Sequence, residues 1–263
     1  YQLSIINYQL SIINYQLFMS EGFYLYGIFP PPGPKQVETK GLDKQPIFSH
    51  TVEGFTFLYS EAQQSRYLAS RRNLITHTKV LEEAMEKGFR TLLPLQFGLV
   101  VSDWESVVQD LLQHQAETLQ LLLERLQGKR EVSLKIYWET DVELNTLLAE
   151  NPSLKAQRDS LEGKQLSMDE VIKIGQALEQ AMEARKQEII ARFEEILMPF
   201  AEEVKENEIL TETMIYNTAF LIPWESEVEF GEKVEMIDAE FAPRLKIRYN
   251  NFTPPYNFVE LRE

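Results

Sequence analysis

The stretch from Tyr249 to Val259 constrains the fold more than any other part of the sequence. It reads YNNFTPPYNFV, and a segment with so many aromatic residues is normally buried. Pro254 and Pro255 cannot donate hydrogen bonds to a sheet, and they hold their backbone extended. The sequence therefore predicts a strand that ends near Asn251, a rigid extended corner, and a short aromatic return onto the core. The return carries Tyr256, Phe258 and Val259.

Composition limits the classes of function. The chain has 263 residues, enough for one large domain or two ordinary ones. It carries 26 basic and 41 acidic residues, and the resulting charge of −15 opposes nonspecific binding to nucleic acid or to an anionic membrane. The absence of cysteine excludes disulfides and thiolate chemistry and fits a reducing cytoplasm. The longest apolar run, Leu92 to Val101, is half the length that a bilayer requires.

The first eighteen residues are a repeat. Tyr1–Asn7 reads YQLSIIN, Tyr8–Asn14 is identical, and a third copy starts at Tyr15. Such identity suggests a recent tandem duplication, and the first methionine is Met19. We expect the native start at Met19, with residues 1–18 upstream of it. The alternative is a genuine extension, a β-prone adhesive arm, because uncharged segments rich in Ile favour strand pairing.

Residues 19–128 predict a mixed α+β domain. Its expected elements, in order, are a buried strand over Phe23–Phe29, a hairpin over Pro46–His50 and Gly54–Tyr59, a helix from about Arg66 to Lys87 that ends at Gly88, and a buried segment over Thr91–Val101. The helix is expected to turn Leu74, Leu81, Ala84 and Met85 inward. The last segment is one strand, or two short strands broken near Pro94 and Gly98.

Four capping boxes of the form Ser/Thr-x-x-Glu predict helix starts. They are Ser102/Glu105, Thr140/Glu143, Ser167/Glu170 and Ser226/Glu229. The first opens a helix that Gly128 stops. The third opens the longest helix, whose apolar face runs from Leu178 to Val204 and which Pro199 kinks or ends. The fourth opens a helix with Phe230, Val234, Ile237 and Phe241 inward.

Residues 129–263 predict a second domain. Strands are expected over Glu131–Trp138, near Ile209, over Met214–Ile222 and over Leu245–Asn251. With two helical regions between them, the order is β-α-β-β-α-β, which is typical of a ferredoxin-like antiparallel sheet with helices on one face. The expected fold class is therefore α+β in two domains, an N-terminal mixed α+β domain and a C-terminal ferredoxin-like sheet with long helices.

Residue patterns of known chemistry are missing. The three histidines, His50, His77 and His114, have no second histidine at ligand spacing, and a surface or structural role is favoured for each. The sequence has no Walker A loop, no G-x-G-x-x-G, no G-x-S-x-G and no H-E-x-x-H. We therefore expect no catalytic residue, no metal and no cofactor, and we predict that the protein is not an enzyme.

Two charge clusters are candidates for binding. Arg66, Arg71, Arg72 and Lys79 have no acid among them, so they suit a phosphate or a partner's acidic edge, or they form an exposed helix face. The stretch from Glu212 to Glu240 holds eight acids and one base, Lys233. A field this negative can steer a basic partner, with Glu227, Glu232 and Glu235 as the candidate contacts. The alternative is solubility, together with favourable acids at a helix N-terminus.

Five blocks in order resemble the gas vesicle GvpF/GvpL family from Met19 onward. They are Tyr24–Ile28, His77–Leu81, Leu93–Gly98, Asn217–Ile222 and the terminal Pro-Pro-Tyr-x-Phe corner. The chain departs from the family pattern at Gln96, where a basic residue is common. It departs again at Asn251-Phe252-Thr253, where the family often has Gly-Pro-Trp.

The resemblance implies an accessory or minor structural protein of the gas vesicle, a gas-filled, protein-walled compartment in prokaryotic cytoplasm. The implied partners are the small hydrophobic shell protein GvpA and other accessory Gvp proteins, without nucleic acid or membrane. The competing hypothesis is a ferredoxin-like small-molecule sensor or adaptor without catalysis, because such sheets carry many functions.

Overall fold

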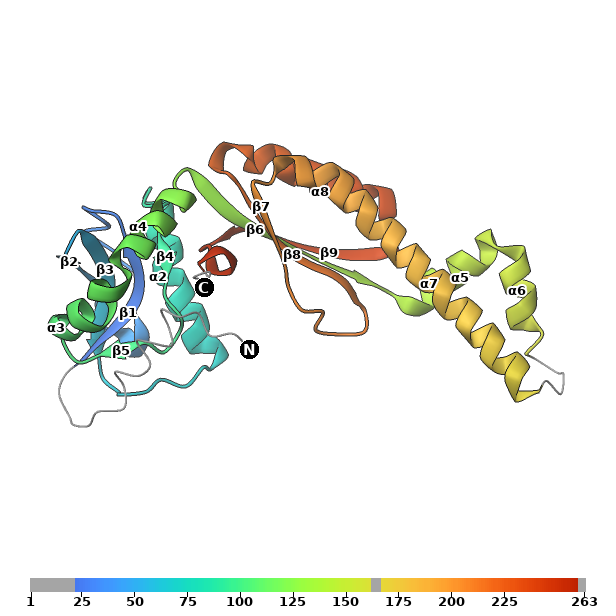
Figure 1. The fold of residues 1–263 in the computed structure, drawn as a ribbon, viewed down its shortest axis with the longest axis horizontal. Coiled ribbons are helices and arrows are strands. Elements are labelled where there is room, and N and C mark those ends of the chain that lie inside the picture. Colours follow the sequence, from blue (N-terminus) through green and yellow to red (C-terminus); the bar gives the residue numbers. More distant parts are fainter. Residues whose placement is uncertain (1–21, 162–166, 260–263) are drawn as a thin grey trace. The chain divides into compact units, whose positions relative to one another are not determined.

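The structure, a computed structural model, describes residues 22–161 and 167–259, which form two compact units (Figure 1). The first unit holds residues 22–132, Leu221–Trp224 and 252–259. The second holds the described residues of Ser133–Phe220 and Glu225–Asn251. The boundary expected between residues 128 and 129 lies near Val132, where the chain first passes from the first unit to the second. Residues 252–259 belong to the first unit and not to the second. The repeat of residues 1–18 lies outside the described residues.

The first unit contains an antiparallel sheet in the order β2-β3-β1-β4, with β5 also paired to β1. Its strands are β1 (Gly22–Phe29), β2 (Phe48–Val52), β3 (Phe55–Ala62), β4 (Leu93–Pro94) and β5 (Val100–Val101). The predicted hairpin is confirmed, and the segment over 91–101 forms two short strands. Glu53 and Gly54 both have positive φ, which is the two-residue turn that suits the right-handed twist of a hairpin.

Helix α2 (Arg71–Glu86) packs on this sheet through Val80, Leu81, Ala84 and Met85, which join Tyr24 and Tyr26 in the core. It begins later than predicted, because Ser70 caps it by accepting the Asn73 N–H. The prediction that Leu74 points inward is wrong, since its side chain is 42% exposed. Leu74 lies on the same side of the helix as Leu81, two turns earlier. It belongs to the first turn of α2, and no residue of that turn joins the hydrophobic cluster.

A second helical segment of the first unit runs through α3 (Trp104–Ser106), η2 (Val107–Leu112) and α4 (Gln113–Leu126). The predicted box at Ser102/Glu105 is wrong, because the cap is Asp103, whose Oδ1 accepts the Ser106 N–H at 2.8 Å. The segment ends as predicted at Gly128, whose φ of +73° is a conformation that glycine adopts readily.

The second sheet has the order β7-β8-β6-β9, which confirms the ferredoxin-like prediction. Its strands are β6 (Lys129–Trp138), β7 (Glu203–Glu206), β8 (Met214–Pro223) and β9 (Leu245–Thr253). Helices α7 (Met168–Leu197) and α8 (Glu227–Phe241) lie beside one another on one side of it (Figure 1). Helices α5 (Thr140–Glu150) and α6 (Pro152–Asp159) pack on α7.

Several local predictions change in this region. The short strand lies at Glu203–Glu206 and not near Ile209, so Val204 is on a strand and not on the long helix. The helix ends before Pro199, as predicted, in a turn at η3 (Met198–Phe200). The capping box at Ser167/Glu170 is confirmed with both reciprocal hydrogen bonds. The predicted box at Ser226/Glu229 is wrong. Ser226 is the last residue of the short turn η4 (Trp224–Ser226), and its side chain makes no capping hydrogen bond.

The predicted C-terminal corner is confirmed. Pro254 and Pro255 are buried, and η5 (Tyr256–Phe258) turns Phe258 inward, where it is 4% exposed. The N–H and the Nδ2 of Asn257 donate to the two carboxylate oxygens of Glu131, at 2.9 and 2.6 Å. The corner is therefore attached by both apolar burial and hydrogen bonds.

Candidate functional site

Helix α8 presents the acidic stretch that the sequence singled out. Its inner face is formed by Phe230, Val234 and Ile237, which are at most 4% exposed. Phe230 contacts the rings of Phe220 and Tyr249. This apolar stripe follows the helical period, so most of the remaining positions of α8 are turned to solvent.

The three predicted contact residues do not form one group. Glu232 and Glu235 are exposed and lie three residues apart, so their side chains share one side of the helix. Glu227 is half-buried, and its Oε1 accepts hydrogen bonds from the Tyr249 hydroxyl at 3.3 Å and from Asn251 Nδ2 at 2.8 Å. Glu227 therefore attaches α8 to β9, and only Glu232 and Glu235 are open to a partner.

Two exposed apolar side chains lie beside these acids. Val228 is 68% exposed and Met236 is 46% exposed. With 3.6 residues per turn, Val228, Glu232, Glu235 and Met236 fall on one side of the helix. We call these four residues the α8 outer face. Carboxylates beside apolar side chains suit a partner that offers both basic and apolar groups.

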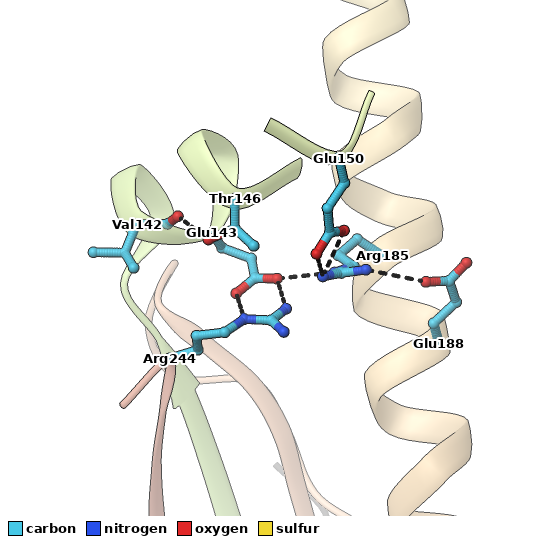
Figure 2. Close-up of polar contacts among 7 residues, drawn as sticks. All are labelled: Val142, Glu143, Thr146, Glu150, Arg185, Glu188 and Arg244. Carbon is cyan, nitrogen blue, oxygen red and sulfur yellow. Dashed lines mark hydrogen bonds and ion pairs between the residues drawn. The ribbon is translucent and has the colours of Figure 1, made fainter. Parts of the chain in front are cut away.

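A buried carboxylate fixes the structure at the C-terminal end of α8 (Figure 2). Glu143 of α5 is fully buried and lies between two guanidinium groups. Its Oε2 accepts from Arg244 Nε at 2.9 Å, Arg244 Nη2 donates to Oε1, and Arg185 Nε of α7 donates to Oε1 at 2.9 Å. Arg244 lies between α8 and β9, so the cluster joins α5 and α7 to this connection.

The charges around Glu143 determine its pKa. Burial alone would raise the pKa of this carboxyl, but hydrogen bonds from Arg244 and Arg185 outweigh burial and hold the pKa below its ordinary value. Arg185 also pairs with Glu150 at 3.1 Å and Glu188 at 3.7 Å. Glu143 is therefore a structural anion that is charged at neutral pH.

Sequence reasoning missed this cluster. The Thr140/Glu143 pattern predicts a capping box, but the N-cap position is Glu139, which makes no side-chain cap bond, and the Glu143 side chain turns toward Arg185 and Arg244. Those arginines lie 42 and 101 residues away in the chain, and no local pattern links them to Glu143.

The histidines are placed as structural or surface residues. His77 is buried, and its Nε2 donates to the Leu95 carbonyl at 3.1 Å, so its Nδ1 accepts from the Tyr24 hydroxyl at 2.9 Å. Burial lowers the pKa of His77 to about 4, which keeps the ring neutral at physiological pH. His50 stacks on Trp104 with ring centroids 4.2 Å apart, and His114 is exposed.

The described residues hold neither a metal-binding cluster nor a helix suited to a membrane. They contain no group of three or more His, Asp or Glu side chains placed to hold a metal ion. No helix in that same part of the chain has the length and apolar character needed to cross a bilayer. The second charge cluster is exposed. Arg66 precedes α2, and Arg71, Arg72 and Lys79 lie on the helix.

Comparisons with known proteins identify the family that this chain resembles. A family model described as "Gas vesicle synthesis protein GvpL/GvpF" matches residues 22–260. Gas vesicle protein F of Dolichospermum flosaquae is 57% identical over 243 residues, covering 92% of this chain and 99% of the relative. The crystal structure of GvpF from Anabaena sp. PCC7120 superposes with a TM-score of 0.81 at 52% identity, covering 93% of this chain and 98% of that one. GvpF from Microcystis aeruginosa gives a TM-score of 0.80 at 51% identity, covering 92% and 100%.

Proposed function

We propose that this chain, which belongs to the GvpL/GvpF family of gas vesicle synthesis proteins, binds the gas vesicle shell protein GvpA directly. In this way it assists nucleation and assembly of the vesicle. We assign it no reaction. Its proposed location is the gas vesicle within prokaryotic cytoplasm, where other accessory Gvp proteins are further candidate partners.

The α8 outer face carries this proposal. Glu232 and Glu235 supply negative charge, and Val228 and Met236 supply apolar contact area on the same side of the helix. Glu227 is excluded from the binding set, because its carboxylate is engaged with β9.

The chemistry of a shell protein explains why such a binder is needed. A protein that builds a wall with one gas-facing surface exposes apolar area before assembly, and such area drives aggregation. An accessory protein that covers part of this area early would keep subunits available for ordered growth. Binding without turnover is sufficient for that role.

Salt separates the two parts of the proposed contact. Exposed charges act mainly on the association rate, and 1 M salt shortens the screening length to roughly 3 Å. We therefore expect added salt to slow association of the two proteins more than it speeds their dissociation.

The direct test is biolayer interferometry with purified GvpA. The E232K/E235K variant should associate more slowly while keeping the wild-type thermal midpoint. The control variant, E53K/E61K, changes the net charge equally at two exposed acids of the first unit. Equal loss of binding in both variants would show that only overall charge matters and would reject the α8 outer face.

A cellular test addresses the role itself. Cells that lack the gene should form few or no vesicles, and the protein should co-purify with washed vesicles or with their assembly intermediates. Normal vesicle formation without the gene, together with no binding of GvpA, would reject the accessory role.

A further inference from the structure

Strand β2 is an edge of the first sheet that lacks the usual protection against pairing (Figure 1). Edge strands normally carry a charge, a proline or a bulge that discourages another strand from adding. Four of the five edge strands in the described sheets have such a feature or are only two residues long. β4 contains Pro94, β5 is the buried pair Val100–Val101, β7 reads EVKE, and β9 carries Lys246 and Arg248.

β2 reads FSHTV and has none of these features. It contains no charged residue and no proline, and its pairing with β3 runs without a bulge. Phe48, at its start, is 43% exposed. An uncharged edge with an exposed aromatic side chain is a site for strand addition.

The register of the hairpin shows which backbone groups are open. The turn at Glu53 and Gly54 makes Val52 and Phe55 a hydrogen-bonded pair, and such pairs alternate along the ladder. His50 therefore bonds to Phe57 of β3, whereas the N–H and C=O of Ser49 and Thr51 point away from β3. Nowhere in residues 22–161 and 167–259 does a hydrogen bond reach these outward groups.

We propose that β2 is a self-association surface, which pairs in antiparallel fashion with β2 of a second copy of this chain about a two-fold axis at His50. In this register Ser49 of each copy bonds to Thr51 of the other, so that the outward backbone groups of both strands are satisfied. Phe48 then lies opposite Val52 of the second copy, on the same face of the sheet, and loses its exposure to water.

The strand itself favours a second copy over an unrelated segment. Because β2 is uncharged, a two-fold pairing brings no like charges together. The contact is isologous, and each copy uses the one unprotected edge of its described sheets, so association closes at a dimer. The proposal is independent of shell-protein binding, because it uses a different unit and can be tested with this chain alone.

A matched pair of variants tests the register. S49E/T51E places two carboxylates of one copy directly opposite two of the other, and it should abolish the dimer. S49E/T51K places each Glu opposite a Lys, and it should keep the dimer with roughly two- to thirtyfold tighter association, from two opposite-charge cross-strand pairs. Both variants lose the Thr51–Thr56 hydroxyl contact equally, so that loss cannot separate them.

The measurement is sedimentation velocity over a concentration series, with thermal unfolding as the folding control. The wild type should show a concentration-dependent dimer. T51P removes an outward N–H and the Thr51–Thr56 hydroxyl contact, but no backbone hydrogen bond to β3, so it should fold and stay monomeric. A wild type that is monomeric throughout, or an S49E/T51E variant that folds and still dimerises, would overturn the proposal.

The uncharged repeat before Met19 is the rival occupant of the β2 edge. A variant that begins at Met19 should still dimerise, and S49E/T51E should abolish that dimer too. Loss of the dimer on removal of the repeat alone would assign the edge to the repeat and overturn pairing of β2 with itself.

Discussion

The two units each bury a glutamate, and the pKa values of the two carboxyl groups shift in opposite directions. Glu131 of the first unit is 2% exposed, and its carboxylate accepts hydrogen bonds from the neutral side chain and the backbone N–H of Asn257. Glu143 of the second unit is fully buried between Arg185 and Arg244 (Figure 2). Burial raises the pKa of Glu131 to about 7, whereas the pKa of Glu143 lies below its ordinary value.

The comparison shows that the partner, and not burial alone, decides the charge of a buried carboxyl. Amide donors stabilise the anion of Glu131 less than burial destabilises it, so the pKa rises. Two guanidinium groups reverse the balance at Glu143. The first unit therefore holds its C-terminal corner with a titratable contact, whereas the second holds α5, α7 and the start of β9 with a permanent charge.

Removing Phe258 should have the largest effect on the first unit. Phe258→Ala deletes a side chain that is 4% exposed, and truncation of a buried Phe lowers the free energy of unfolding by about 4 kcal/mol. Urea unfolding measures the change, and Leu68→Ala, at a residue that is 79% exposed, is the control. A Phe258→Ala variant that stays as stable as wild type but no longer binds shell protein would make the corner an interface and not an anchor.

Removing Glu143 should have the next largest effect, in the second unit. Glu143→Ala leaves two guanidinium groups without their shared anion, and breaking a buried ion pair costs about 3 kcal/mol. The control is Glu188→Ala, whose side chain is 71% exposed and lies 3.7 Å from Arg185, with an expected change below about 1 kcal/mol. A Glu143→Ala variant as stable as Glu188→Ala would mean that the cluster contributes little.

Glu131 should make the stability of the fold depend on pH near neutrality. Its pKa in the folded protein, about 7, is above the ordinary value of 4.5, so the stability it contributes is fully present below pH 4.5 and is lost as the pH rises through about 7. The loss is about 3 kcal/mol. Tyr256, the titratable neighbour of Glu131, has a pKa raised to about 12 and stays neutral in this window.

The measurement compares wild type with Glu131→Gln by urea unfolding from pH 5 to pH 8. The variant loses one hydrogen bond from Asn257 at every pH, so only the pH-dependent part of the difference reports the carboxyl. Wild type should lose stability relative to Glu131→Gln as the pH rises. Glu143 gives the opposite sign, because its lowered pKa removes stability only as the pH falls. A constant difference across the range would contradict the assignment.

The sequence predicted the elements with regular patterns well. Alternation along Glu131–Trp138 identified β6, the 3.6-residue period identified α8, and the order of elements identified the ferredoxin-like sheet. Local side-chain chemistry was harder. Three of the four capping boxes failed. Asp103 caps the first helix instead of Ser102, and neither Glu139, at the N-cap position of α5, nor Ser226 makes a side-chain cap bond.

The candidate site was predicted only in part. Glu232 and Glu235 are exposed as expected, because the apolar stripe of α8 fixes which side faces water. The different role of Glu227 depends on Tyr249 and Asn251, which β9 brings next to α8. Contacts between residues so distant in the chain, like those of Glu143, follow from the tertiary fold and leave no mark in the local sequence.

Removing the repeat should have the smallest effect. The comparison of Glu131 with Glu143 would then concern the two units alone. A variant that begins at Met19 should match the full chain in thermal midpoint and unfolding cooperativity, because the letter-perfect identity of the YQLSIIN copies suggests a recent tandem duplication. The core described for the two units is built from residues Tyr24 to Val259. Thermal unfolding followed by circular dichroism measures both quantities. A broadened transition, or a midpoint lowered by several degrees, would show that the repeat supports one of the units, and the Glu131 and Glu143 variants would then need to be compared in both chain lengths.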